Sequence, residues 1–476
     1  MDADHRVRIS HAPGPPIFKL HCDILGYIFN INADMNSDNK GLWETRALNV
    51  LRYTSQVCHD WRETILSSPS LWGKVVDVDL PHQNKVLWRQ EVLRRSCDAP
   101  LCISGSVNGY PEGSLGFFSC LLMDHWPRIR KLDVSFTNYY MLQLDVICTA
   151  FQRPAPHLES FMIFVEQWDS SDSHQNHSFM DDYPKALFLD HAPMLLEFMF
   201  PPTRREIVRL GAPWFNQLHS LSLFQDFTAA EVLIALENIR SLKSLELHEC
   251  VKWSTLPEKK PISLPSLSNI LVYSHLLPLL EYIIPSSNCS LTIRPISMTD
   301  EDVAAIQRTV THFSQFWFDS RVLKTFTIKY GFKILSFGSP FTQGGVPSFQ
   351  VVIHTKNYIS PSAVPVILGS FSSMVFHDTS SLEFILTSLP FHEPEKTALE
   401  AFLSSFSSVE VLHASGGTIK FLLEVPTDRQ VLFPSLKTLK FRLIRGESKD
   451  SLMDILIRFA VSRAVAGAPI TDLDIE

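Results

Sequence analysis

One apolar pattern recurs along most of the chain, and it constrains the fold more than any other feature. It has the form apolar-x-x-apolar-x-apolar, whose last two apolar positions alternate as in a strand with one buried face. Clear copies begin at Ile129, Leu158, Leu195, Leu218, Leu242, Leu267, Leu323, Val346, Leu436 and Ile470, and blurred copies lie near Leu291, Leu382 and Val409. The copies that start at residues 195, 218, 242 and 267 are 23, 24 and 25 residues apart. This regular spacing indicates a repeated structural unit.

The physics of such a unit predicts how the copies assemble. Each copy supplies one short strand and a helix or turn that returns the chain, and no copy can bury its apolar face alone. The copies are therefore expected to stack, with a parallel sheet along one side, as an irregular leucine-rich-repeat-like α/β solenoid. Spacings of 29, 35 and 37 residues elsewhere imply insertions. The alternative is a general α/β sandwich in which such strands recur by chance.

Charge excludes one class of function. The net charge is −8, so nucleic-acid binding driven by bulk positive charge is not expected. Residues 157–197 carry eight acidic side chains against one basic side chain, Lys185, and hold most of this excess. With 45% hydrophobic and 19% charged residues, the chain is expected to be ordered.

The termini and cysteines point to an intracellular protein. The first ten residues lack an apolar signal segment, and the longest uncharged runs contain prolines, so no secretory signal or membrane contact is expected. Eight cysteines without a CxxC pair do not form a disulfide scaffold. We expect a soluble cytoplasmic or nuclear protein. Cys22 and Cys58 lie in apolar helical segments and are interpreted as core residues.

The first 100 residues have a different, helical pattern. Apolar residues from Leu20 to Ile28 share one helix face, and this helix is expected to end at Asn30. Residues 32–41 are rich in turn formers and predict a loop, and helical spacing returns over residues 47–65. A stop signal comes next at 67–69, then an extended run at 75–80 and a helix at 84–96. Residues 105–109 are interpreted as a turn.

Three segments of this region together resemble an F-box. They are IFKLHCDILGYIF (17–29), SQVCHDWRETI (55–65) and SPSLW (68–72), although His21 stands where the family usually has proline. The resemblance, which extends to the large fungal group of F-box proteins over about the first 105 residues, implies a helical module that binds a Skp-family adaptor of cullin-RING ubiquitin ligases. The residues implied to bind the adaptor are Leu20, Ile24, Leu25, Ile28, Phe29, Val57, Cys58, Trp61, Leu71 and Trp72.

These observations predict an F-box substrate receptor of an SCF-type ligase, which selects a protein target for ubiquitin-dependent degradation. The expected domains are a leader (1–16), the F-box-like module (17–72), a connecting α/β segment with the first repeats (73–125) and the repeat region (126–476). No hydrolase or nucleotide-binding signature occurs, so we expect no catalysis, no cofactor and no metal. The alternatives are a repeat scaffold whose F-box-like segment is only an N-terminal cap, and an enzyme of unrecognised type.

The acidic stretch holds the candidate target contacts. An insertion near residues 166–185 carries Trp168, Asp169, Asp172, Asp181 and Asp182, which could contact a basic target. His174 and His177 among these carboxylates could instead bind a divalent metal, although their spacing matches no dedicated site. A third interpretation is a hydrated insertion without function.

Overall fold

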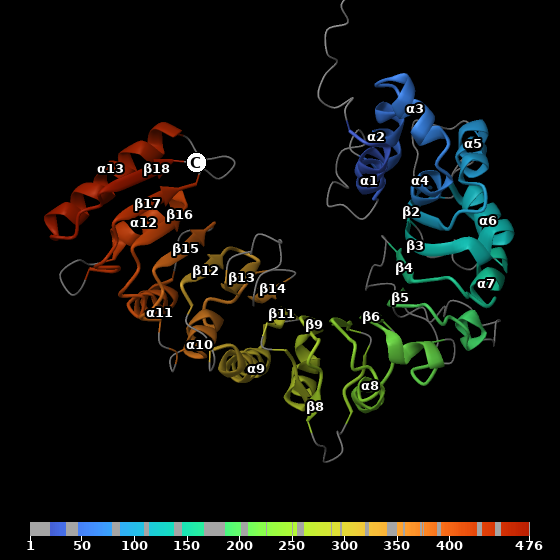
Figure 1. Ribbon diagram of the computed structural model, residues 1–476. Coiled ribbons are helices and arrows are strands. Elements are labelled where there is room, and N and C mark those ends of the chain that lie inside the picture. Colours follow the sequence, from blue (N-terminus) through green and yellow to red (C-terminus); the bar gives the residue numbers. More distant parts are fainter. Residues whose placement is uncertain are drawn as a thin grey trace, which may run out of the picture. The chain divides into compact units, whose positions relative to one another are not determined.

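The computed structural model is mixed α/β, with parallel pairing dominating its strands (Figure 1). It describes residues 20–34, 46–78, 86–108, 114–137, 145–165, 186–200, 208–224, 226–249, 251–254, 261–286, 288–295, 298–318, 323–339, 350–355, 358–371, 374, 376–387, 392–425, 431–442 and 449–475. Contacts divide the chain into two compact units, Met1–Pro201 and Pro202–Glu476. None of the described helices is both long enough and apolar enough to cross a bilayer.

The first unit begins with four short helices and continues with strands and helices in alternation. Its helices are α1 (Cys22–Asn32), α2 (Ala47–Thr54), α3 (His59–Leu66), α4 (Pro69–Lys74), α5 (Val86–Ser96), α6 (Ser114–His125) and α7 (Asp145–Phe151). Its strands are β1 (Val76–Asp77), β2 (Leu101–Val107), β3 (Ile129–Phe136), β4 (Ser160–Val165) and β5 (Glu197–Phe200), paired in that order and all parallel. Helices α6 and α7 lie along one side of these strands (Figure 1).

In the described part of the second unit, six α-helices lie along one side of the main sheet (Figure 1). The helices are α8 (Ala229–Leu236), α9 (Asp300–Phe318), α10 (Ala363–Gly369), α11 (Glu393–Leu403), α12 (Gly416–Glu424) and α13 (Lys449–Val465). The strands are β6 (Ser220–Leu223), β7 (Ser244–Leu247), β8 (Ile262–Ser263), β9 (Asn269–Tyr273), β10 (Ile283–Ile284), β11 (Ser290–Arg294), β12 (Thr325–Tyr330), β13 (Ile334–Gly338), β14 (Gln350–His354), β15 (Ser381–Leu386), β16 (Val411–Ala414), β17 (Thr438–Phe441) and β18 (Asp472–Ile475). β8 and β10 form a separate parallel pair.

The recurring apolar pattern marks strands, and the strand register explains it. Each copy falls on one strand, and the equivalent apolar positions of neighbouring strands stand directly opposite each other. Leu245 pairs with Leu221 on one side and with Ile270 on the other, and all three are buried. The same pairing runs from Leu382 through Leu412, Leu439 and Leu473. A one-residue slip would expose the whole apolar row, so the pattern fixes the register.

One part of the second unit departs from the expected uniform parallel order. There the sheet runs β11-β14-β13-β12-β15, and β13 is antiparallel to both of its neighbours. Chain order is thus reversed across a three-stranded meander. The cause is the short connection between Tyr330 and Ile334, which allows a hairpin but not a parallel crossover. No copy of the pattern marked β13.

Three local predictions need correction. The helical stretch expected over 47–65 is two helices, α2 and α3, separated by residues 55–58, and α1 ends at Asn32 instead of Asn30. The stop expected at 67–69 is confirmed, because α3 ends at Leu66, and Pro69 then starts the next helix, α4, since proline fits the first helical turn. The turn expected at 105–109 is wrong over its described part, because β2 continues to Val107.

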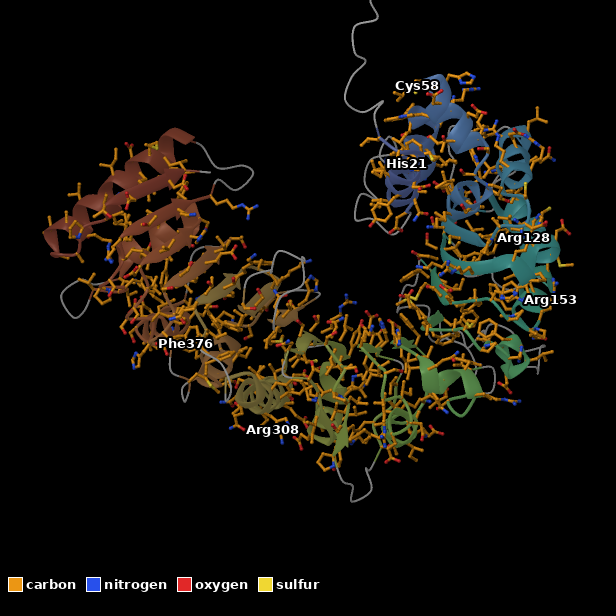
Figure 2. The ribbon with its side chains drawn as sticks, viewed as in Figure 1. His21, Cys58, Arg128, Arg153, Arg308 and Phe376 are labelled. Carbon is orange, nitrogen blue, oxygen red and sulfur yellow. The ribbon has the colours of Figure 1, made fainter. Side chains whose placement is uncertain are left out.

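Arginine side chains close helix ends within the first unit. Arg128 Nη2 donates to the carbonyl of Ser96, the last residue of α5, at 3.4 Å and to that of Ala99 beyond the helix at 2.7 Å. Arg153 donates from Nη1 to the carbonyl of Met123 in the last turn of α6 at 3.1 Å (Figure 2). The final carbonyls of a helix lack partners inside it, so a cationic donor there stabilises the helix end.

Candidate functional site

The N-terminal helices form a small core of their own. Leu25 and Phe29 of α1, Leu51 of α2 and Ile65 of α3 are all buried. The Phe29 ring meets the Trp61 ring edge to face, with centroids 5.3 Å apart. Such a pair adds roughly 0.5–1.5 kcal/mol beyond its area burial. The helices therefore pack as one body in spite of their short lengths.

The ten residues expected to contact an adaptor occupy three different environments. Leu25, Phe29, Leu71 and Trp72 are buried inside the chain. Leu20, Ile28, Cys58 and Trp61 are half-buried. Only Ile24 and Val57 are exposed, with 50% and 57% of their surface accessible. The apolar side chains quoted from the sequence thus serve the core more than the surface.

Helices α1 and α2 also expose apolar residues that were not among the ten expected contacts. Tyr27 and Ile31 of α1 are 67% and 55% exposed, and Tyr53 near the end of α2 is 47% exposed. Ile24, Tyr27 and Ile31 are spaced by three and four residues, so they share one helix face. We call Ile24, Tyr27 and Ile31 the α1 face. The spacing of these three residues is visible in the sequence. However, α1 carries apolar residues on both sides, so the pattern alone could not distinguish the buried face from the exposed one.

Trp72 is a structural anchor. Its indole Nε1 donates to the Ile65 carbonyl at 2.9 Å, and its ring meets that of Trp88 edge to face. The Arg95 guanidinium lies 4.6 Å from the Trp72 ring centroid, a cation–π distance. Glu91 holds Arg95 there at 2.8 Å, and hydrogen bonds from Arg94 and Arg95 lower the Glu91 pKa to about 2. These contacts from α5 fix the position of Trp72 and therefore of α4.

Two polar contacts join the first helices to the region of α4 and β1. Lys74 donates to the Asn30 side chain at 2.5 Å, and Arg46 lies 3.2 Å from Asp77 of β1. Gly73 supports the same junction, because a Cβ there would stand 2.4 Å from the Pro100 carbonyl oxygen. The N-terminal helices are therefore joined by direct contacts to the segment that holds α4 and β1.

The cysteines do not match the prediction. Cys22 is exposed and Cys58 is half-buried at the N-cap of α3, so the expectation that both are core residues is wrong (Figure 2). His21, Cys22 and Asp23 bring three potential ligand atoms within 4.8 Å of one another, but all three residues are exposed. His21 Nδ1 already accepts the Asp23 amide, which caps α1. Partial burial raises the pKa of the Cys102 thiol, and full burial raises that of Cys289, which disfavours the reactive thiolate.

The acidic candidates fall elsewhere. Trp168, Asp169, Asp172, Asp181 and Asp182, together with His174 and His177, lie outside the described residues. Their contacts with a target or a metal remain a prediction from the sequence.

Comparison of the chain with protein-family models gives no match, and comparison with curated proteins gives none either.

Proposed function

We propose that the chain is the substrate-recognition subunit of an SCF-type ubiquitin ligase. In this proposal the N-terminal helices bind a Skp-family adaptor, and the strand-rich remainder, an irregular leucine-rich-repeat-like solenoid, presents a surface to a protein target. The protein itself supplies no bond chemistry. It raises the effective concentration of the target near a charged conjugating enzyme.

The observation that supports adaptor binding most is the α1 face. The three side chains stand on one face of a helix whose opposite side is packed in the core. A helix that is apolar on both faces normally has a second partner. Large side chains at the centre of such contacts commonly account for about 2 kcal/mol or more each.

A second candidate is a repeat scaffold in which the helices only cap the first strands. The contacts from Lys74 to Asn30 and from Arg46 to Asp77 favour it, since they join the helices to the rest of the unit. A cap needs its inner face packed and needs no apolar outer face. The exposed α1 face is what favours the receptor over the cap.

Paired charge substitutions separate the two candidates. Tyr27→Asp with Ile31→Asp should lower the affinity for a purified Skp-family adaptor by about 100-fold or more, as two desolvated anchors are lost. The matched control is Ile457→Asp with Val461→Asp on α13, because these residues are 57% and 56% exposed and spaced by four. Isothermal titration calorimetry gives the affinity, and circular dichroism checks the fold. Equal affinities for both double variants, or no binding by the unaltered chain, would favour the cap.

A further inference from the structure

A pair of exposed aromatic side chains lies beside the turn that joins β12 to β13. Phe332 is 65% exposed and Tyr358 is 58% exposed, and their ring centroids are 6.1 Å apart. Ile334, the first residue of β13, is 37% exposed. Single exposed apolar residues need no explanation, but a group of large ones at one place marks an interaction surface.

Backbone hydrogen bonds hold this ring pair in place. The Phe332 carbonyl accepts from the Ile359 N–H at 3.1 Å, which brings the turn to the segment that carries Tyr358. The Lys333 carbonyl accepts from the Thr355 N–H at 3.0 Å, directly after the end of β14. The rings are therefore presented by an ordered backbone, and a surface that is already ordered loses less entropy when a partner binds.

Cationic side chains stand at the same edge of the sheet. Arg294 ends β11 and His354 ends β14, and the residues before them, Ile293 and Ile353, are partners in these adjacent parallel strands. His354 in turn stands opposite Ile334 of β13. Arg294 and His354 are both exposed. Helices α9 and α10 lie on the other side of these strands (Figure 1). The ring pair and the cations therefore share one exposed edge.

Two of the cations at this edge have no counter-ion among the described residues. Arg294 and Lys333 are exposed, and no carboxylate oxygen of the described chain lies within 4.0 Å of either. Glu246, two strands away on β7, senses the charge of Arg294. However, its carboxylate is already paired with Ser222 and His248. The positive charge at this edge is therefore available to an acidic group from outside the chain.

We propose that Arg294, Lys333, Phe332 and Tyr358 form a docking site for an acidic segment of the protein target that carries a large apolar side chain between its carboxylates. The guanidinium and the ammonium bind the carboxylates, and the ring pair receives the apolar side chain. A basic segment would meet like charge, and an acidic segment without an apolar side chain would leave the rings in water. The inference rests on the proposed function and deepens it, because it names the chemistry of the target.

Two peptides test this site with the full chain. The first is Ac-Gly-Glu-Phe-Glu-Glu-Gly-amide with 4-fluorophenylalanine as its aromatic residue, and the second has glutamine in place of each glutamate. Fluorine NMR of the peptide gives both affinities, because its signal broadens on binding to a large protein. The acidic peptide should bind saturably and about 10-fold more tightly than the glutamine peptide.

Three outcomes of this titration overturn the proposal. The first is equal affinity for both peptides, and the second is no binding of the acidic peptide at about 1 mM. The third is displacement of the acidic peptide by a short oligothymidylate at a lower concentration than by the unlabelled peptide, since aromatic rings beside cations also bind single-stranded nucleic acid.

Matched variants assign the binding to these residues. Arg294→Gln with Lys333→Gln should weaken binding of the acidic peptide by about 10-fold or more, and Phe332→Ser should weaken it by several-fold. The control is Arg308→Gln with Lys420→Gln, which removes the same charge from the exposed surface of α9 and α12. Figure 2 shows Arg308 on the helical side of the sheet. The control should bind as tightly as the unaltered chain.

Equal losses in the two double variants would mean that net charge alone attracts the peptide, and would overturn the site. Adaptor affinity, measured separately, should be the same in all of these variants. Failure of the ligase proposal and failure of this site therefore give different results.

Discussion

At the scale of single residues, the main uncertainty in the sequence was which large apolar side chains face inward. Trp72 and Tyr27 are both aromatic residues of the F-box-like region, yet one is buried and the other is 67% exposed. Trp72 is packed against Trp88 and Arg95, which belong to α5, a helix that follows β1 in the chain. The periodicity of one helix carries no information on such a distant contact. The sequence therefore showed that Trp72 and Tyr27 are large aromatic residues, but not which of them is buried.

Gly73 has no side chain, and this absence has a measurable consequence for the stability of the fold. Gly73→Ala would put a Cβ 2.4 Å from the backbone oxygen of Pro100, which cannot move as a flexible side chain could. We expect a loss of roughly 1–3 kcal/mol in the free energy of unfolding, measured with urea. Gly116→Ala in α6 is the control, because no atom lies within 4 Å of its added Cβ. That variant should be neutral or more stable, and a stable Gly73→Ala protein would contradict the junction described here.

At the scale of elements, strands were the most predictable part of the fold. An inward row such as Leu382, Leu412 and Leu439 repeats because every strand must offer an apolar side chain at that height, so the sequence itself records it. The β12–β13–β14 meander was missed because β13 pairs inside a hairpin and lacks the pattern. The stacked rings at the ends of β6 and β7 were missed for a related reason. Phe224 and His248 meet only once the register is known.

Strand β16 allows the two faces to be compared by substitution. Leu412 is fully buried between Leu382 and Leu439, while its neighbour Val411 points outward and is half-buried. Leu412→Ala should lower the free energy of unfolding by about 2–5 kcal/mol, as expected for a large-to-small change in a core. Val411→Ala should cost roughly 1 kcal/mol or less. Similar losses from both changes in urea unfolding would mean that the register is wrong.

At the scale of the whole molecule, the helices proposed to bind the adaptor and most of the strands belong to different units. The α1 face lies in the first unit, and the larger share of the described strands lies in the second. A receptor needs this division, because adaptor and target must be held at the same time.

Hydrogen exchange in the presence of a purified Skp-family adaptor tests the central claim most directly. The account predicts a one-to-one complex with a Kd of about 1 μM or lower. Protection from exchange should concentrate on α1 and on residues 53–57, with the α13 region unchanged. The account is contradicted if no complex forms at about 50 μM of each protein, or if the protected amides lie outside the N-terminal helices.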